Sequence, residues 1–303
     1  MKSSLKTRFA QGAALLTCLF SLSAHAGEGA FGWLYTLDLQ PKGKLEFEQR
    51  VDVTHRQSAG SYNWSQFRSE LEYGLTNDLQ VSAYLNAYTI GANRNYINPE
   101  ACDDVLPCTA GFGVPTTVSG STRSFNGRGV DGVSLEAVYR LTNPVTSPVG
   151  VGFYVEPTFG KLENELETRL ILQSNFLDDR FIVAVNLLSE IEHEKYSDGI
   201  IRNSMADLLY GATYRFASNW SGGVEGRLHT DFDGAFYQSH SQTANFLGPV
   251  LHYAAKDFWV TAVWRHQLNG HCYNDGTADC SVGHVSDNHG RDQFMVKIGI
   301  PLN

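Results

Sequence analysis

The side chains of this chain that could carry out chemistry are glutamates and arginines that recur at every second position. In the run from Glu165 to Arg169, residues 165, 167 and 169 are charged, whereas Leu166 and Thr168 are not. A spacing of two places such side chains on one face of an extended strand. Carboxylates and guanidinium groups on one face can form ion pairs with one another, or they can select charged solutes. The candidates, among which Glu outnumbers Arg, are Glu46, Glu48, Arg50, Arg68, Glu70, Glu72, Glu136, Arg140, Glu156, Glu165, Glu167, Arg169, Glu190, Glu192, Arg215, Glu225, Arg227 and Arg265.

The opposite face of the same stretches is apolar. Between Val133 and Leu141 the odd-numbered residues are all apolar or aromatic, and Ser134, Glu136 and Arg140 alternate with them. Such alternation indicates β-strands whose two faces meet different environments. About a dozen stretches of this kind follow Gly43, and many exceed the roughly five or six residues usual for strands of globular proteins.

The connections between these stretches alternate in length. Short ones are expected at 76–78, 142–144, 177–179, 217–219 and 255–257, and the intervening ones are longer or irregular. Short turns at one end and longer loops at the other are typical of outer-membrane barrels. We therefore predict an all-β fold, a transmembrane antiparallel up-and-down β-barrel of about 12 strands, over residues 43–303. A large soluble β-sandwich, with its apolar faces turned inward, is the alternative.

Residues 1–26 have the features of a secretory signal peptide. An apolar run from Ala13 to Phe20 follows a basic start, and Ala24-His25-Ala26 resembles a cleavage site. We therefore expect a mature chain that begins at Gly27 and resides in the outer membrane of a Gram-negative cell. A lipoprotein cleaved before Cys18 is the alternative. The chain has a formal net charge of −9 and residues 1–26 contain no acidic residue, so the remainder is more acidic still, which argues against nucleic acid as a partner.

Three segments resemble a family of uncharacterised Gram-negative outer-membrane β-barrel proteins. The segments are Ala30–Thr36, which contains a Tyr-Thr pair, the Pro-Lys-Gly-Lys-x-Glu-x-Glu-Gln run of Pro41–Gln49, and Glu70–Asn77, which is similar to that family's first periplasmic turn. The resemblance extends over the whole mature chain and implies the barrel fold. Its motifs are structural, so it implies no particular activity.

The segment 27–42 precedes the first expected strand and is rich in large apolar residues, including Phe31, Trp33, Leu34 and Tyr35. It is a candidate for a plug inside the lumen or for a segment at the periplasmic rim. An extra strand or an ordered tail is the simpler expectation, and the sequence slightly favours it.

Four cysteines remain after the signal peptide, and they fall into two close pairs. Cys102 and Cys108 lie in one long loop, and Cys272 and Cys280 lie in another. An even number in an oxidising compartment predicts two local disulfides rather than a metal site.

These features favour a narrow channel for small polar or cationic solutes, because rings of charged side chains set the selectivity of pores. We expect a monomer in contact with outer-membrane lipid, with no cofactor and no metal. The same charged residues would also suit a closed structural or adhesion barrel, filled by Arg–Glu pairs and acting through its outer loops. A surface lipid-modifying enzyme is a third hypothesis, although no G-x-S-x-G motif is present.

Overall fold

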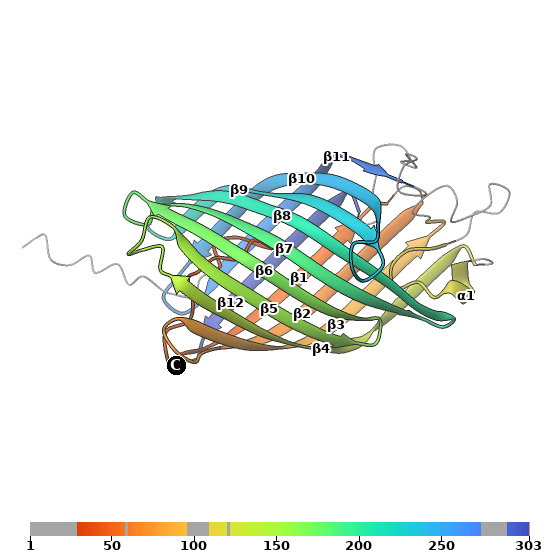
Figure 1. The fold of residues 1–303 in the computed structure, drawn as a ribbon, viewed down its shortest axis with the longest axis horizontal. Helices are drawn as coiled ribbons and strands as arrows, with labels where there is room; N and C mark the ends of the chain where they lie inside the picture. The colour runs from red at the N-terminus through yellow and green to blue at the C-terminus, as the bar shows by residue number, and fades with distance from the viewer. Residues whose placement is uncertain (1–28, 58–59, 96–108, 120–121, 274–289, 303) are drawn as a thin grey trace, which may run out of the picture.

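The computed structural model describes residues 29–57, 60–95, 109–119, 122–273 and 290–302, and these form one closed β-barrel (Figure 1). The elements are β1 (Leu45–His55), β2 (Ser61–Gly74), β3 (Leu79–Asn93), α1 (Thr116–Ser119), β4 (Ser124–Thr142), β5 (Gly150–Gly160), β6 (Glu163–Phe176), β7 (Phe181–Tyr196), β8 (Gly199–Ala217), β9 (Trp220–Asp233), β10 (Ser239–Ala254), β11 (Trp259–Cys272) and β12 (Asp292–Pro301). Among these residues no helix is long and apolar enough to cross a membrane.

Each strand pairs antiparallel with its neighbours in sequence, and the barrel is closed where β1 pairs with β12. At this closure Phe47 lies opposite Ile300 and Val51 lies opposite Val296. Closure leaves no sheet edge, which a membrane-spanning sheet requires because an unpaired backbone group in hydrocarbon costs several kcal/mol. The predicted fold class and strand number are confirmed.

The alternation seen in the sequence divides the strands into an outer apolar face and an inner polar face. On β4 the outward Leu135 is 54% exposed, whereas Ser134 and Glu136 on either side of it are buried. The exposed apolar side chains continue around the barrel on every strand from β2 to β12. A barrel whose outer face contacts lipid exposes these apolar side chains, whereas a soluble β-sandwich would bury them in its core. The sandwich alternative is therefore wrong.

Pro249 lies inside β10, where a proline cannot donate a hydrogen bond to a neighbouring strand. It pairs with Val224 of β9, but the register with β11 runs to Leu247 and resumes only at Val250. The strand therefore accommodates Pro249 by interrupting its pairing on one side only.

The two ends of the barrel differ. We call the end that carries connections 75–78, 143–149, 177–180, 218–219 and 255–258 the turn end, and the opposite end the loop end. The loop end carries the long connections 94–123 and 273–291, but it also carries the two-residue connections 161–162 and 197–198. The predicted alternation of lengths is therefore only partly right: β7 and β8 are themselves long, and extra residues there lengthen the strands instead of the loop.

The lipid-facing assignment makes a quantitative prediction for Leu135. Arginine at this position should lower the free energy of unfolding by about 2–4 kcal/mol, because a cation near the bilayer midplane is poorly solvated. The matched control is Leu141→Arg on the same face of β4 at the turn end, where the cost should be about 0–1 kcal/mol. Urea unfolding of the protein in lipid vesicles measures both, and equal costs at the two positions would contradict the assignment.

Candidate functional site

The lumen of the barrel contains part of the protein's own chain. Residues 29–40, which we call the inner segment, precede β1 and contact inward-facing side chains on strands all around the barrel. Phe31 and Leu37 of this segment are 1% and 0% exposed. The segment forms no strand, so the extra strand that the sequence slightly favoured is not found between residues 29 and 44.

Backbone groups of the inner segment are satisfied by polar side chains of the wall. The carboxylate of Glu225 accepts from the N–H groups of Gly32 and Trp33 at 2.8 and 2.9 Å. The amide of Asn186 accepts from Tyr35 N–H at 2.8 Å and donates to the carbonyl of Tyr35 at 3.0 Å. A buried backbone group without a partner is costly, and these side chains supply the partners that a sheet would otherwise give.

Further wall residues continue the same pattern toward Gln40. Gln173 accepts from the N–H of Leu37 at 2.6 Å, and Gln80 accepts from the N–H of Gln40 at 2.8 Å. The guanidinium of Arg140 donates to the carbonyl of Leu37 at 3.1 Å. The inner segment is thus bonded at close intervals to strands that are far apart in the sequence.

Two arginines hold the aromatic side chains of the inner segment. The guanidinium of Arg265 lies 3.7 Å from the ring centre of Trp33, and that of Arg169 lies 4.5 Å from the ring centre of Tyr35. Arg169 also donates to the carbonyl of Trp33 at 2.6 Å. Such cation–π contacts are worth about 2 kcal/mol when desolvated, so each arginine adds to the hydrogen bonds of the backbone.

Burial shifts the pKa values of two groups in the inner segment, Tyr35 and Asp38. The Tyr35 hydroxyl donates to Glu136 at 3.0 Å, and burial, together with the charge of Glu136, raises the pKa of Tyr35 well above its usual value. Burial also raises the pKa of Asp38, although a hydrogen bond from Gln173 at 3.4 Å opposes this effect. Tyr35 therefore stays a neutral hydrogen-bond donor at physiological pH.

Apolar side chains of the inner segment form two hydrophobic clusters with the wall. The first consists of Ala30, Phe31, Leu34, Ala184, Leu188, Met205, Leu209, Val250, Val263 and Met295. The second consists of Leu37, Leu39, Val138, Tyr154 and Ile171. The lumen is therefore not polar throughout, because the inward face of several strands carries apolar residues where the inner segment packs.

The structure distributes the sequence-predicted site residues over several environments. Buried ones are Glu46, Glu48, Glu70, Glu72, Glu136, Glu156, Glu167, Arg169, Glu190, Glu225, Arg227 and Arg265. Partly buried ones are Arg50, Arg68, Arg140, Glu165, Glu192 and Arg215. The sequence-predicted residues that contact the inner segment include Glu72, Glu136, Arg140, Arg169, Glu225 and Arg265.

Other predicted residues are held in ion pairs. Arg68 pairs with Glu156, and Arg50 pairs with Asp52 at 2.6 Å. Glu46 accepts from the indole N–H of Trp259 at 2.9 Å. Arg215 lies at the turn end, where it donates to the carbonyl of Asp178 at 3.5 Å, and at the same end Arg140 binds Asp78 at 3.0 Å.

Arg227 belongs to a buried network that sequence reasoning did not assemble. It pairs with Asp207, which also binds His229 at 2.8 Å. His229 in turn lies 2.9 Å from Asp231. Polar positions of period two on neighbouring strands are the signal that would have suggested it, but only the strand register shows that Asp207 reaches β9.

A row of glutamates lies along β6 and β7 on the lumen side. Glu163 is directly opposite Glu194, Glu165 is opposite Glu192, and Glu167 is opposite Glu190. We call these six residues the acidic ladder. The sequence-based list lacked Glu163 and Glu194, which lie where the two strands approach the loop end.

Part of the predicted chemistry falls outside the described residues. Cys102, Cys108 and Cys280 lie there, and Cys272 ends β11, so both disulfides stay predictions. The ring of His240 packs at a tilt against those of Phe232 and Tyr273, with centroids 5.6 and 4.8 Å away. That contact suits a packing role.

This closed antiparallel barrel, with its apolar outer face and polar lumen, has the fold of an outer-membrane β-barrel. Residues 23–302 match the model of a family of unknown function, DUF6662, and the chain belongs to that family. No curated protein matches the chain in sequence.

Solved structures of porins and channels are similar to the chain in fold. The NanC porin is 12% identical, with a TM-score of 0.50 over 84% of this chain and 100% of that one. An outer-membrane channel from Pseudomonas putida F1 is 10% identical, with a TM-score of 0.52 over 86% of this chain and 96% of that one. Likeness at this level of identity establishes the fold.

The Glu225 carboxylate makes a prediction for the inner segment. In Glu225→Ala the N–H groups of Gly32 and Trp33 lose charged acceptors worth about 1.5–3 kcal/mol each. Their amides should then exchange with deuterium roughly 10–100-fold faster. Exchange mass spectrometry of peptides covering residues 29–40 measures this, and Glu194→Ala is the control, because Glu194 bonds Tyr196 and Asn203 instead. Unchanged protection in Glu225→Ala would contradict the anchoring role.

Proposed function

We propose that this protein is a gated outer-membrane channel for small polar or cationic solutes. In this proposal it is a monomer, the turn end lies on the periplasmic side, and the inner segment is the gate, here in its closed position. The observation that supports it most is the acidic ladder, whose six carboxylates face the lumen in three directly opposed pairs.

The acidic ladder lowers the stability of the fold. Like charges directly opposite each other on neighbouring strands repel. Among the described residues, the ladder has one ion-pair partner, Arg169, which binds Glu167 at 2.5 Å. Glu194 receives hydrogen bonds from the neutral groups of Tyr196 and Asn203. A wall with this much uncompensated negative charge attracts cations into the lumen, as acidic rings do in cation-selective pores.

The opposite wall carries cations as well as carboxylates. In the closed order of strands, β6 and β7 lie across the barrel from β12 and β1. There Lys297, Arg50 and Arg68 occupy adjacent positions on β12, β1 and β2. Each of these cations has its own carboxylate partner, namely Glu48, Asp52 and Glu156. The cations of this wall are therefore neutralised within the protein, whereas the ladder keeps most of its negative charge.

The inner segment has the properties expected of a gate. Its backbone is bonded to side chains of the wall and not to a strand, so each of these bonds can be exchanged for one to water. Because no strand pairs with the inner segment, its release would leave the strand pairing of the barrel intact, as local opening without global unfolding requires. Opening would move the segment out of the lumen and expose the wall residues that now hold it.

A closed structural barrel is the second candidate, and the two hydrophobic clusters favour it. Together they bury Phe31, Leu34, Leu37 and Leu39 of the inner segment. Burial of each such side chain contributes about 1.5–3 kcal/mol, which opposes opening. Conductance separates the two candidates.

The gate makes a prediction for Leu34. An aspartate at this position loses the burial of Leu34 and places a carboxylate in the first hydrophobic cluster, so it should expel the inner segment. We expect the open fraction in planar bilayers to rise at least about 10-fold relative to the wild type, since 1.4 kcal/mol corresponds to a factor of ten. The control is Val145→Asp, the same kind of change at an exposed position in the connection 143–149. A correctly folded Leu34→Asp barrel that stays silent would support the closed structural barrel.

The acidic ladder makes a separate prediction on selectivity. Glu165→Gln combined with Glu192→Gln, introduced together with Leu34→Asp, should reduce the preference for K⁺ over Cl⁻, because a directly opposed pair of lumen charges is removed. Reversal potentials in a KCl gradient measure the preference. Asp257→Asn, which neutralises an exposed carboxylate in the turn 255–258, should leave it unchanged. Equal reversal potentials for the ladder variant and its parent would remove the ladder from the filter.

A further inference from the structure

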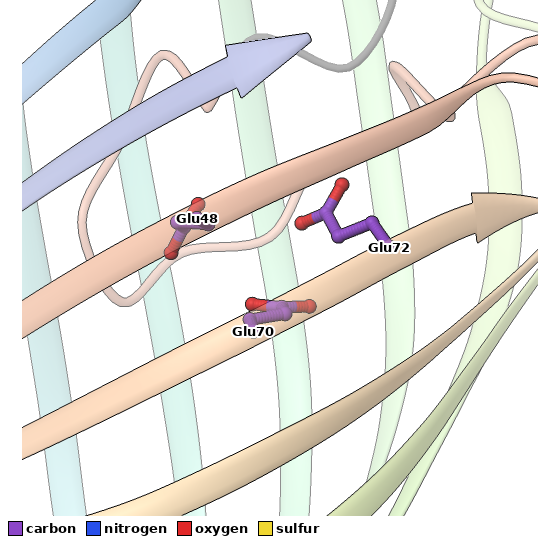
Figure 2. A group of neighbouring side chains, drawn as sticks. All are labelled: Glu48, Glu70 and Glu72. Carbon is purple, nitrogen blue, oxygen red and sulfur yellow. The ribbon is translucent and has the colours of Figure 1, made fainter. Parts of the chain in front are cut away.

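Three carboxylates meet on the inner face of β1 and β2, away from the acidic ladder. Oxygen atoms of Glu48, Glu70 and Glu72 all lie within 4.8 Å of one another. Figure 2 shows Glu48 on one strand and Glu70 and Glu72 on the next, with the carboxylate of Glu72 directed toward the other two. All three side chains are buried.

The described partners of this cluster do not balance its charge. Lys297 binds Glu48 at 3.1 Å and is the cation paired with the cluster among the described residues. The amide of Gln40 in the inner segment donates to Glu72 at 3.3 Å and carries no charge. Three carboxylates and one ammonium leave an excess of two negative charges. Buried charges of this kind are normally paired or bound to a metal ion, because an isolated charge is expensive to desolvate.

One atom of the cluster points to a missing ligand. Oε1 of Glu70 is fully buried and has no hydrogen-bond partner among the described residues. The side chain of Glu70 as a whole is only 4% exposed. A buried carboxylate oxygen without a donor calls for an explanation, and a bound ion or water molecule is one of the usual ones.

A cavity next to the cluster, lined by Glu48 and Glu72 but not by Glu70, provides room for an ion. It has a volume of about 50 Å³, and Glu48, Glu72 and Lys297 line it on the barrel side. Residues of the inner segment, including Tyr35 and Asp38, line its other side. A space of this size holds a cation together with a few water molecules.

We propose that Glu48, Glu70 and Glu72 bind a divalent cation of the size of Ca²⁺. Ca²⁺ takes oxygen ligands at about 2.3–2.6 Å, so two ligands on opposite sides of the ion lie about 5 Å apart. The three oxygens already satisfy this limit. Mg²⁺, with ligands at about 2.0–2.1 Å, would require them within about 4 Å and would keep more of its water. A charge of +2 also equals the excess of the cluster.

The bound ion would connect the wall to the inner segment. Gln40 touches Glu72, and the cavity is closed on one side by the inner segment. Binding of the ion itself rests only on the cluster and the cavity, so it does not depend on channel activity.

The test is titration calorimetry with CaCl₂ on the refolded full-length protein, stripped of metal by a chelator and kept at constant ionic strength. We expect one saturable site in the wild type and weaker binding of MgCl₂. Glu70→Gln should weaken Ca²⁺ binding at least tenfold. Glu194→Gln, a similar loss of a carboxylate in the acidic ladder, should leave the Kd within twofold. No saturable site in the wild type, or an unchanged Kd in Glu70→Gln, would overturn the proposal.

Thermal unfolding provides a second test of Ca²⁺ binding, which remains informative if a variant is less stable than the wild type. In chelator, Glu70→Gln should unfold at a higher temperature than the wild type, because it relieves repulsion in the cluster. Ca²⁺ should raise the Tm of the wild type and of Glu194→Gln by stabilising the folded state alone, and leave that of Glu70→Gln almost unchanged. Equal Ca²⁺ shifts in all three proteins would place binding elsewhere. A fourth protein, Glu165→Gln, tests the second group of carboxylates, Glu165, Glu167 and Glu190. If this variant were the only one to lose the Ca²⁺-induced rise in Tm, Ca²⁺ would bind at that second group and not at Glu70.

Discussion

The structure depends on the pairing of every backbone group that lies in hydrocarbon. Because an open edge is not tolerated there, β1 must pair with β12, and the chain must form a closed ring of strands. Closure then determines which side chains face lipid and which face the lumen. Apolar residues such as Leu135 face lipid, and the alternating polar residues face a lumen too narrow for them to remain fully hydrated. The lumen therefore has to satisfy a large number of charges with groups of the protein itself.

The inner segment supplies some of these groups, because its backbone forms hydrogen bonds with polar side chains of the wall. It brings unpaired backbone N–H groups into the lumen, and the wall supplies acceptors such as Glu225 and Asn186. Charge-assisted bonds of this kind are stronger than neutral ones, so a carboxylate that would otherwise repel its neighbours becomes an anchor. Glutamates of the lumen thus stabilise the fold where donors match them, as at Glu225, and destabilise it where carboxylates outnumber cations, as along β6 and β7.

Local alternation allowed the sequence to predict the strands, the lipid-facing residues and the closure of the barrel. A plug inside the lumen was one of the positions that the sequence left open for the inner segment, but its contacts could not be predicted, because its partners are distant in sequence: Gly32 and Glu225 are 193 residues apart. Asn186 looked like an ordinary polar lumen residue, and only the fold shows that it binds both backbone groups of Tyr35. Periodicity assigns a side chain to a face, whereas contacts across a lumen depend on which strands lie opposite.

The uneven distribution of partners separates structural charge from functional charge. Arg68 with Glu156, and Arg50 with Asp52, balance each other's charge within the protein. The acidic ladder and the carboxylate cluster around Glu70 are incomplete, and their repulsion lowers the stability of the fold. Natural proteins keep such local conflicts mainly at functional sites. A cation, mobile in the lumen or bound beside the inner segment, is the partner that both sites lack, and for that reason the two unbalanced regions carry the functional proposals.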